Sequence, residues 1–293
     1  MEENKEQEKQ VVEVPTEKPA GIKQEVEKKV EQKVEPEPAP VKKTKQGPVT
    51  LVVGEKEFKK MDNVVKSLNG LVEEATFKVT SEGLNVLSMD AANVAMIVWK
   101  FSAKNFLQYA ETNVEFRVNI KQLQAAFKRF DKGTVEFTIG DNLKMKNVSK
   151  NTKGFTIPLI VDEEKAQKVP ELKPTSSLTM DTVDFEDMIK DVAVFEEAVT
   201  FKSRSGRFRC KSKGDTTGSL HDFNNVITTG TDATSKYAIL YLKKMIISSF
   251  KEVSIKFAND YPALIEYTED NNSILFIIAP RCETEWGNKN GKP

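Results

Sequence analysis

A short phrase of apolar and polar residues occurs twice in the chain, and this repeat constrains the fold more than any other feature. Residues 73–78 read EEATFK, and residues 196–202 read EEAVTFK. Each phrase follows a stretch with apolar side chains at helical spacing and leads to a turn that contains Gly83 or Gly206. The order strand, helix, strands, helix, strands occurs twice, which predicts a duplicated α+β architecture.

Apolar periodicity divides the chain further. Apolar residues three and four apart predict helices over residues 57–72, 119–130, 184–195 and 237–250, and the β-rich runs between them predict strands. We expect two similar domains, each with two helices packed on antiparallel sheet, at residues 48–161 and 176–283. Residues 162–175 combine charges with prolines and predict an exposed connector.

Both termini differ in composition from the rest. Residues 1–47 hold Glu, Lys, Gln, Val and Pro but no aromatic residue, which predicts a disordered, charged tail. A transient helix over residues 22–34 stays open, since apolar residues recur there every four positions. The basic run at residues 41–45 is either a nuclear address or a solvated stretch. Residues 284–293 are expected to be a flexible C-terminal tail.

The composition excludes several classes of protein. Lys plus Arg and Asp plus Glu number 44 each, so any contact with nucleic acid depends on local arrangement of charge. Cys210 and Cys282 lack metal-ligand spacing, and the single His221 cannot form a histidine metal site or a hydrolase triad. We expect no metal and no cofactor. No long apolar run is present, which predicts a soluble intracellular protein without membrane contact.

Common catalytic motifs are absent. The chain has no GxSxG, no GxGxxG and no phosphate-binding loop. Acidic pairs such as Glu73 and Glu74 are interpreted as solvated element ends. The sequence therefore predicts that the protein is not an enzyme, and a small enzyme with an unrecognised site is kept only as a third hypothesis.

Residues 81–101 read SEGLNVLSMDAANVAMIVWKF. A turn at Ser81–Gly83 leads into a strand, Met89 and Asp90 interrupt it, and a second β-rich run begins at Val94. The pattern predicts two strands joined by a short exposed connection.

This stretch resembles the GxNxxxMDxxxVxxxxxxF segment of the proliferating cell nuclear antigen (PCNA) family of sliding clamps. Further matching phrases lie at residues 68–75, 118–120, 169–171, 260–267 and 278–283, so the resemblance covers residues 49–283. The pattern is most similar to the archaeal type, with the eukaryotic clamp as the next nearest relative.

The resemblance implies a function. It implies the DNA-clamp fold, in which three subunits associate head to tail into a ring whose helices line the hole. Such a ring encircles duplex DNA, acts as a polymerase processivity factor and is a docking platform for replication and repair proteins. Implied partners are DNA polymerase, clamp loader, flap nuclease and ligase, bound through PCNA-interacting peptides. A checkpoint-type subunit of a heteromeric ring is the alternative, and homotrimer and heterotrimer both stay open.

Two sets of residues carry these expectations. By themselves, basic residues on the predicted helices favour an ordinary solvated face, but with the resemblance they become the candidates for contact with DNA phosphates: Lys59, Lys66, Lys121, Lys128, Arg129, Lys190 and Lys243. By the resemblance, partner peptides enter a pocket formed by Met89, Asn93, Val94, Met96, Val169, Pro262, Ile277, Ala279 and Pro280.

The resemblance also implies a position in the cell and the edges of the ring. An archaeal-type clamp would be cytoplasmic and associated with the nucleoid, and a eukaryotic one would be nuclear. The subunits would meet near residues 155–159 and 219–223. Leu240 and Ile247 depart from the family pattern, because the family tends to be polar at these positions of the fourth helix.

Overall fold

The computed structural model describes residues 48–110, 112–130, 132–161, 167–214 and 216–281. All of them belong to one compact unit. The predicted tails at 1–47 and 284–293 lie outside the described residues, as do residues 162–166 of the predicted connector.

The first half of the described chain contains two α-helices and nine strands. Its elements are β1 (Val49–Val53), α1 (Glu55–Leu71), β2 (Glu74–Thr80), β3 (Gly83–Met89), β4 (Ala95–Ser102), a 3₁₀ turn (Ala103–Asn105), β5 (Phe106–Gln108), β6 (Val114–Asn119), α2 (Ile120–Phe127), β7 (Thr134–Ile139), β8 (Asn142–Val148) and β9 (Thr152–Pro158).

The second half repeats this order. Its elements are β10 (Ser176–Asp181), α3 (Thr182–Val192), β11 (Ala198–Arg204), β12 (Arg207–Lys213), β13 (Gly218–Ile227), β14 (Thr229–Gly230), β15 (Ala233–Ala238), α4 (Ile239–Leu242), β16 (Glu252–Phe257), β17 (Ala263–Glu269) and β18 (Asn272–Ile278). The predicted duplicated α+β architecture is confirmed.

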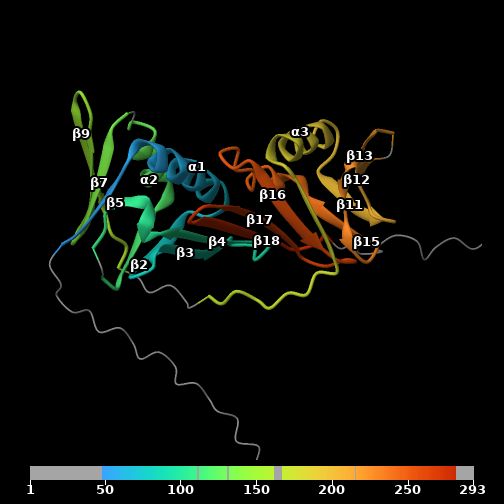
Figure 1. Ribbon diagram of the computed structural model, residues 1–293, viewed down its shortest axis with the longest axis horizontal. Helices are drawn as coiled ribbons and strands as arrows, with labels where there is room; N and C mark the ends of the chain where they lie inside the picture. The colour runs from blue at the N-terminus through green and yellow to red at the C-terminus, as the bar shows by residue number, and fades with distance from the viewer. Residues whose placement is uncertain (1–47, 111, 131, 162–166, 215, 282–293) are drawn as a thin grey trace, which may run out of the picture. The chain divides into compact units, whose positions relative to one another are not determined.

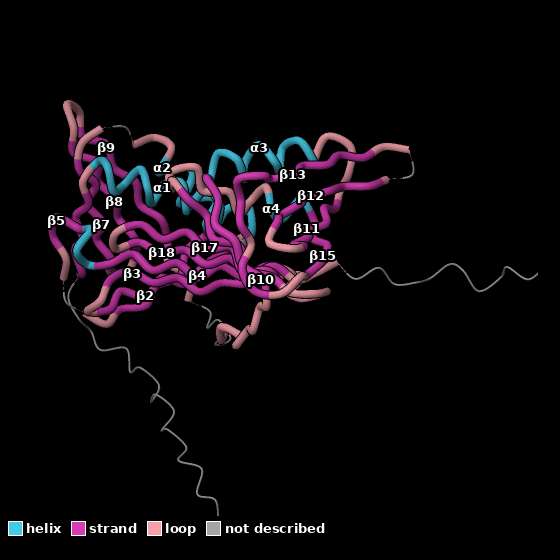
Figure 2. The backbone as a smooth tube through the Cα atoms, turned by 45° about the vertical axis from the view of Figure 1, so that its right-hand side comes forward, coloured by secondary structure: helices cyan, strands magenta, loops and turns pink. Residues whose placement is uncertain are grey.

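The strands form three antiparallel sheets. Their orders are β5-β1-β7-β8-β9, β14-β10-β16-β17-β18-β4-β3-β2-β6 and β13-β12-β11-β15. The nine-stranded sheet joins the two halves, because β4 of the first half pairs with β18 of the second. The labelled helices lie on one side of the sheets (Figure 1), and Figure 2 shows the same layering after a turn of 45°.

Helix α1 follows from its apolar stripe. Met61, Val65 and Leu68 recur at spacings of three and four and are almost completely buried. The helix ends where Val72 turns to an extended conformation and enters β2. Burial of this stripe against the sheets holds the helix in place, since an isolated helix of this length is marginal in water.

The fourth predicted helix was wrong in extent. The sequence pattern indicated a helix over residues 237–250, whereas α4 covers only Ile239–Leu242 and Tyr237 belongs to β15. Ile246, Ile247, Ser248 and Ser249 are weak helix formers, so the chain turns after α4. Ile247 is nevertheless buried, and an apolar spacing that resembles a helical stripe therefore comes from an irregular turn.

One strand pairing within the chain has an unpaired counterpart. β4 of the first half pairs with β18 of the second half. The strand equivalent to β4 in the second half is β13, and the strand equivalent to β18 in the first half is β9. These two strands stand at the ends of their sheets, each with one edge that pairs with no described strand. Such edges are templates for pairing with another chain.

The correspondence between the halves holds at the level of single hydrogen bonds. After β9, the Ile160 amide donates to the Arg117 carbonyl of β6 at 2.9 Å. After β18, the Arg281 amide donates to the Lys236 carbonyl of β15 at 2.7 Å. The hydrogen bond that links the segment after the last strand of each half to a neighbouring strand is thus repeated. Residues of one half can therefore be matched with residues of the other.

Candidate functional site

The turn between β3 and β4 is organised by one carboxylate. Asp90 is 6% exposed, and its Oδ1 accepts hydrogen bonds from the Val94 and Ala95 amides, both at 2.7 Å. Its Oδ2 accepts a longer one, 3.2 Å, from the Ala92 amide. A carboxylate that satisfies three backbone N–H groups fixes a turn that would otherwise leave them unpaired. This explains why an aspartate interrupts the two strands.

The same carboxylate joins the two halves of the chain. The Tyr241 hydroxyl, at the end of α4, donates to Asp90 Oδ2 at 2.8 Å. This hydrogen bond, together with partial desolvation, raises the pKa of Tyr241. Lys244 Nζ lies 5.4 Å from the centre of the Tyr241 ring. The turn therefore depends on a residue about 150 positions away in the sequence.

Next to this turn, apolar side chains line up across three strands. Met89 of β3 is opposite Met96 of β4, and Met96 is opposite Ile277 of β18. Ile97 and Phe276, the neighbours of Met96 and Ile277, belong to the core under the helices. Because side chains alternate along a strand, Met89, Met96 and Ile277 face the other side of the sheet. The ladder brings together three of the predicted pocket residues.

Other predicted pocket residues surround this row. The Ala279 amide donates to the Val94 carbonyl at 2.8 Å, so the chain after β18 lies beside the turn. Pro262 and Pro280 are half-buried, and Asn93 is exposed with φ of 56°. A left-handed conformation is tolerated by asparagine better than by most residues.

Val169 comes from the connector and is 43% exposed. Residues 167–175 run along the side of the sheet that faces away from the helices (Figure 1). Their backbone is tied to the segment before β17, where the Lys173 amide donates to the Tyr261 hydroxyl at 3.2 Å. The connector thus passes the same face that carries the apolar row.

Sequence reasoning missed part of this surface. Leu87, Val98, Leu264 and Leu275 are half-buried and alternate with core residues, and the ladder pairs Leu87 with Val98 and Val98 with Leu275. We call the outward-facing set the apolar sheet face: Leu87, Met89, Met96, Val98, Leu264, Leu275 and Ile277. Period-two alternation on neighbouring strands was the signal that could have found it.

The predicted basic residues divide into two groups. Lys66, Lys121, Lys128, Arg129 and Lys243 are exposed and make no ion pair with the described residues. Lys59 is paired with Glu55 at 2.7 Å, and Lys190 with Glu186 at 2.9 Å. The paired side chains have less charge to offer a ligand, so the first group is the stronger candidate for phosphate contact.

Charges on α1, α2 and α3 influence one another across the helix face. Desolvation raises the pKa of Asp62 on α1, and the nearby Lys128 and Lys66 oppose this rise. The pKa of Glu186 is lowered mainly by a hydrogen bond from Lys190 and next by one from Ser248. The charge of Lys66 also contributes to this lowering. Lys66 therefore lies within electrostatic reach of both halves.

Helix α3 carries more negative than positive charge, which disfavours the predicted contact of Lys190 with DNA phosphates. Its sequence TVDFEDMIKDV contains four carboxylates and one cation. Glu186 and Asp187 both pair with Lys190. The positive potential of the helix side is consequently expected to be concentrated over α1 and α2.

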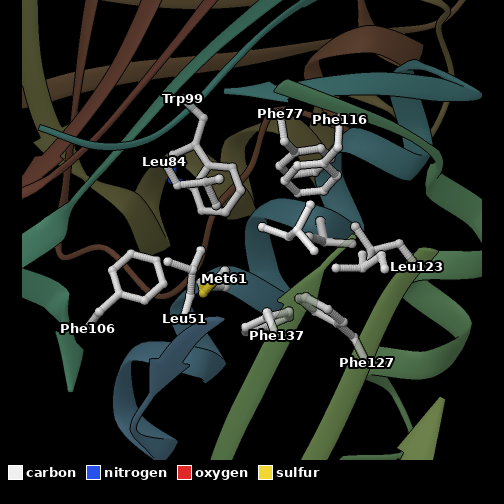
Figure 3. Close-up of a pocket in the computed structure, with 13 residues that line it drawn as sticks. Leu51, Met61, Phe77, Leu84, Trp99, Phe106, Phe116, Leu123, Phe127 and Phe137 are labelled. Atoms are coloured by element: carbon white, nitrogen blue, oxygen red, sulfur yellow. The ribbon is translucent and has the colours of Figure 1, made fainter. Parts of the chain in front are cut away.

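A cavity of about 30 Å³ lies within the core of the first half, enclosed by apolar side chains such as Met61, Trp99 and Phe127. Figure 3 shows these side chains pointing toward one another, with the rings of Phe77 and Phe116 stacked at 5.2 Å. The lining offers no polar atom to a ligand, so this cavity is a small packing void.

The described residues hold neither a cluster of metal ligands nor a membrane-spanning helix. Within the described residues, no group of three or more His, Cys, Asp or Glu side chains is placed to hold a metal ion. No described helix is both long and apolar enough to cross a membrane.

The chain is similar to known sliding clamps. The family model described as "Proliferating cell nuclear antigen, N-terminal domain" matches residues 55–187. The DNA polymerase sliding clamp of Pyrococcus furiosus is 29% identical over 243 residues, an alignment that covers 78% of this chain and 96% of that protein.

Solved structures show the same fold. The PCNA of A. fulgidus, solved with the C-terminal region of FEN-1 bound, has a TM-score of 0.73 at 23% identity and covers 81% of this chain and 100% of that one. A PCNA2–PCNA3 complex from Sulfolobus tokodaii has a TM-score of 0.72 at 22% identity, covering 79% and 99%.

The architecture is therefore that of the DNA clamps. Over most of its described length the chain is similar to the PCNA family of DNA polymerase sliding clamps. This family is non-enzymatic, in agreement with the prediction that the chain is not an enzyme.

Proposed function

We propose that this chain assembles with two further copies into a closed ring that encircles duplex DNA, confers processivity on DNA polymerase and presents docking surfaces to replication and repair proteins. In this proposal residues 48–161 and 176–283 are the two clamp domains and residues 162–175 connect them. The observation that carries the proposal is the pair of free edges, β9 and β13.

Within the chain, the counterparts of these edges are already paired. β18 corresponds to β9 and β4 corresponds to β13, and β4 pairs with β18 over seven residues. If β13 of one copy pairs with β9 of the next in the same way, the seam inside each chain is repeated between chains. A head-to-tail contact of this kind closes into a ring when its rotation allows. The family resemblance implies three chains.

The register of this seam can be derived from the repeat. Phe77 pairs with Val86, and Val86 with Trp99. In the second half Phe201 pairs with Cys210, and Cys210 with His221. Trp99 and His221 are therefore equivalent, and by the same step Val98 is equivalent to Leu220.

The same procedure relates β18 to β9. Phe137 pairs with Met145 and Met145 with Phe155, as Ile255 pairs with Ile265 and Ile265 with Phe276. Phe155 thus matches Phe276, and Gly154 matches Leu275. Since Val98 is opposite Leu275, Leu220 of one copy is expected opposite Gly154 of the next.

DNA would pass on the helix side. Lys66, Lys121, Lys128, Arg129 and Lys243 project from or follow helices and are not neutralised by the described carboxylates. Such contacts attract phosphates without reading bases, which permits sliding. Lys59 and Lys190 contribute less because they are already paired.

Partner peptides would bind the apolar sheet face together with Asn93, Val94, Val169, Pro262, Ala279 and Pro280. Aromatic and aliphatic anchors in an apolar pocket are the usual carriers of such affinity. Expected partners are DNA polymerase, the clamp loader, a flap nuclease and ligase. The proposed site of action is the nucleoid in the cytoplasm of an archaeal-type cell. A checkpoint-type subunit of a heteromeric ring is the alternative.

The mass of the purified chain in solution tests self-assembly. One chain has a mass of 33.0 kDa, and light scattering at micromolar concentration is expected to give three times this value. A single-chain mass would contradict a ring of identical subunits and would favour the heteromeric alternative. Addition of candidate partner subunits would then be the control.

A further inference from the structure

Strands β11 and β12 carry a dense row of cations. Except for Thr200, their exposed or half-exposed positions are all occupied by cations: Lys202, Arg204, Arg207, Arg209, Lys211 and Lys213. We call this set the basic sheet face. It lies outside both the apolar sheet face and the candidate DNA-contacting residues of the helices.

The basic sheet face points away from the helices. Phe201, Phe208 and Cys210 alternate with its residues along the two strands and are fully buried in the core. Helix α3 packs against β12 and β13 on that core side. Because successive side chains of a strand project to opposite faces, the six cations lie on the outer side of the sheet.

Among the described residues, few carboxylates lie close enough to neutralise these cations. Arg209 forms a two-pronged pair with Asp222 of β13, at 2.6 Å and 2.7 Å. Among the described residues, Lys202, Arg204, Arg207, Lys211 and Lys213 form no ion pair. Two strands of cations side by side repel one another, and a polyanion bound to them would relieve that repulsion.

The first half uses the equivalent positions differently. Since Val86 corresponds to Cys210, Leu87 corresponds to Lys211 and Met89 corresponds to Lys213. The duplicated scaffold thus carries apolar docking side chains in one half and lysines in the other. The outward positions of the second half have diverged toward an electrostatic surface.

We propose that the basic sheet face is a second DNA-binding surface, which contacts the phosphate backbone of a duplex outside the ring without reading its sequence. A protein segment normally anchors through apolar or aromatic side chains. Two exposed large apolar side chains of β13 border this face, Leu220 opposite Lys211 and Ile227 opposite Arg207. The proposed seam would cover Leu220, and a single remaining isoleucine gives a protein segment little apolar surface to anchor on. No aromatic side chain of β11 or β12 faces outward, so stacking of unpaired bases has no platform here.

The spacing of the cations suits a phosphate backbone. Alternate residues of a strand lie about 6.6 Å apart, and neighbouring strands are about 4.8 Å apart. Arg204 and Arg207 are directly opposite each other, as are Lys202 and Arg209. Guanidinium groups bind phosphate oxygens in a two-pronged geometry, which favours Arg204 and Arg207 as the strongest contacts.

Binding to a relaxed, covalently closed plasmid reports only the outer surface of the ring. An intact ring cannot thread onto a closed circle without a loader, so the hole of the ring does not contribute. The variant with Arg204→Gln, Arg207→Gln, Lys211→Gln and Lys213→Gln is compared with the wild type across a salt series. Loss of four phosphate contacts is expected to lower the slope of log affinity against log salt by about 3.6. Affinity at low salt should fall by more than about tenfold.

A matched variant carries Lys66→Gln, Lys121→Gln and Lys128→Gln on the helix side, and we expect it to bind the closed circle like the wild type. Unchanged melting and unchanged mass of the outer variant show that its fold and assembly are intact. If that variant melts early, single Arg207→Gln should still lower the salt slope by about 0.9. Mass in solution separately reports a failure of ring assembly.

Three results would overturn the inference. The first is that the outer variant binds the circle with the wild-type affinity and salt slope. The second is that only the helix-side variant loses binding to the circle. The third is tighter binding of an oligo-glutamate peptide than of a duplex carrying the same charge at the same salt concentration. That result would assign the basic sheet face to an acidic protein segment.

Discussion

Replacing Met89 and Pro280 together by alanine is expected to lower the affinity for a partner peptide by about 100-fold or more. Met89 lies in the row with Met96 and Ile277, Pro280 follows β18 next to the β3–β4 turn, and neither residue belongs to the core under the helices. Anchors of this kind each contribute about 2 kcal/mol or more, and 1.4 kcal/mol corresponds to a factor of ten. The loss should appear mainly as faster dissociation.

The measurement is a titration of a labelled peptide that contains a glutamine with apolar and aromatic anchors. Lys213→Ala is a matched control, because Lys213 occupies the position in the second half that Met89 occupies in the first. It should leave the affinity unchanged. An unaltered affinity of the Met89 and Pro280 double variant would remove these residues from the docking site, provided its mass in solution matches that of the wild type.

Neutralising three cations on the helix side is expected to weaken DNA binding in a salt-dependent way. Lys66, Lys121 and Lys128 are exposed and make no ion pair with the described residues, so each can displace one counterion from DNA. In the triple glutamine variant, the slope of log affinity against log salt for a short duplex should fall by about 2.7. The basic sheet face is present in both proteins, so the difference reports the helix side.

Lys59→Gln is the control for this experiment. Lys59 projects from the same helix as Lys66, yet its charge is already engaged by Glu55 at 2.7 Å. Its replacement should change the slope less than Lys66→Gln does. Equal effects of Lys59→Gln and Lys66→Gln, or an unchanged slope in the triple variant, would contradict the assignment of the DNA face.

The sequence was sufficient to predict the duplicated fold, for a physical reason. Helix α1 and the strands around it bury strongly periodic apolar residues, and this periodicity can be counted directly. It fails where an irregular segment happens to bury residues at helical spacing, as Ile247 and Phe250 do after α4. Periodicity records which side chains are buried but not the backbone that buries them.

The candidate site was less accessible to sequence reasoning. The phrase around Met89 could be located, but the reason for Asp90 could not, because its partners include the Tyr241 hydroxyl from the other half of the chain. Pairing of Lys59 and Lys190 with carboxylates one helical turn away could have been foreseen from the spacing of four. The outward alignment of Leu87 with Val98 required the strand register.

Formation of a disulfide across the proposed seam tests ring closure most directly. Leu220→Cys and Gly154→Cys are introduced together with Cys282→Ser, and opposite residues of an antiparallel pair lie within disulfide range. A side chain at Gly154 is tolerated, since an added Cβ would meet only the Met145 carbonyl oxygen at 3.6 Å. The control moves the second cysteine two residues along the strand, to Thr156, beyond that range.

On oxidation, the Leu220→Cys, Gly154→Cys protein is expected to run as a covalent species of three chains on a non-reducing denaturing gel, and the control as single chains. Single chains from both proteins, or cross-linking of the control alone, would contradict the β13–β9 seam and with it the proposed ring.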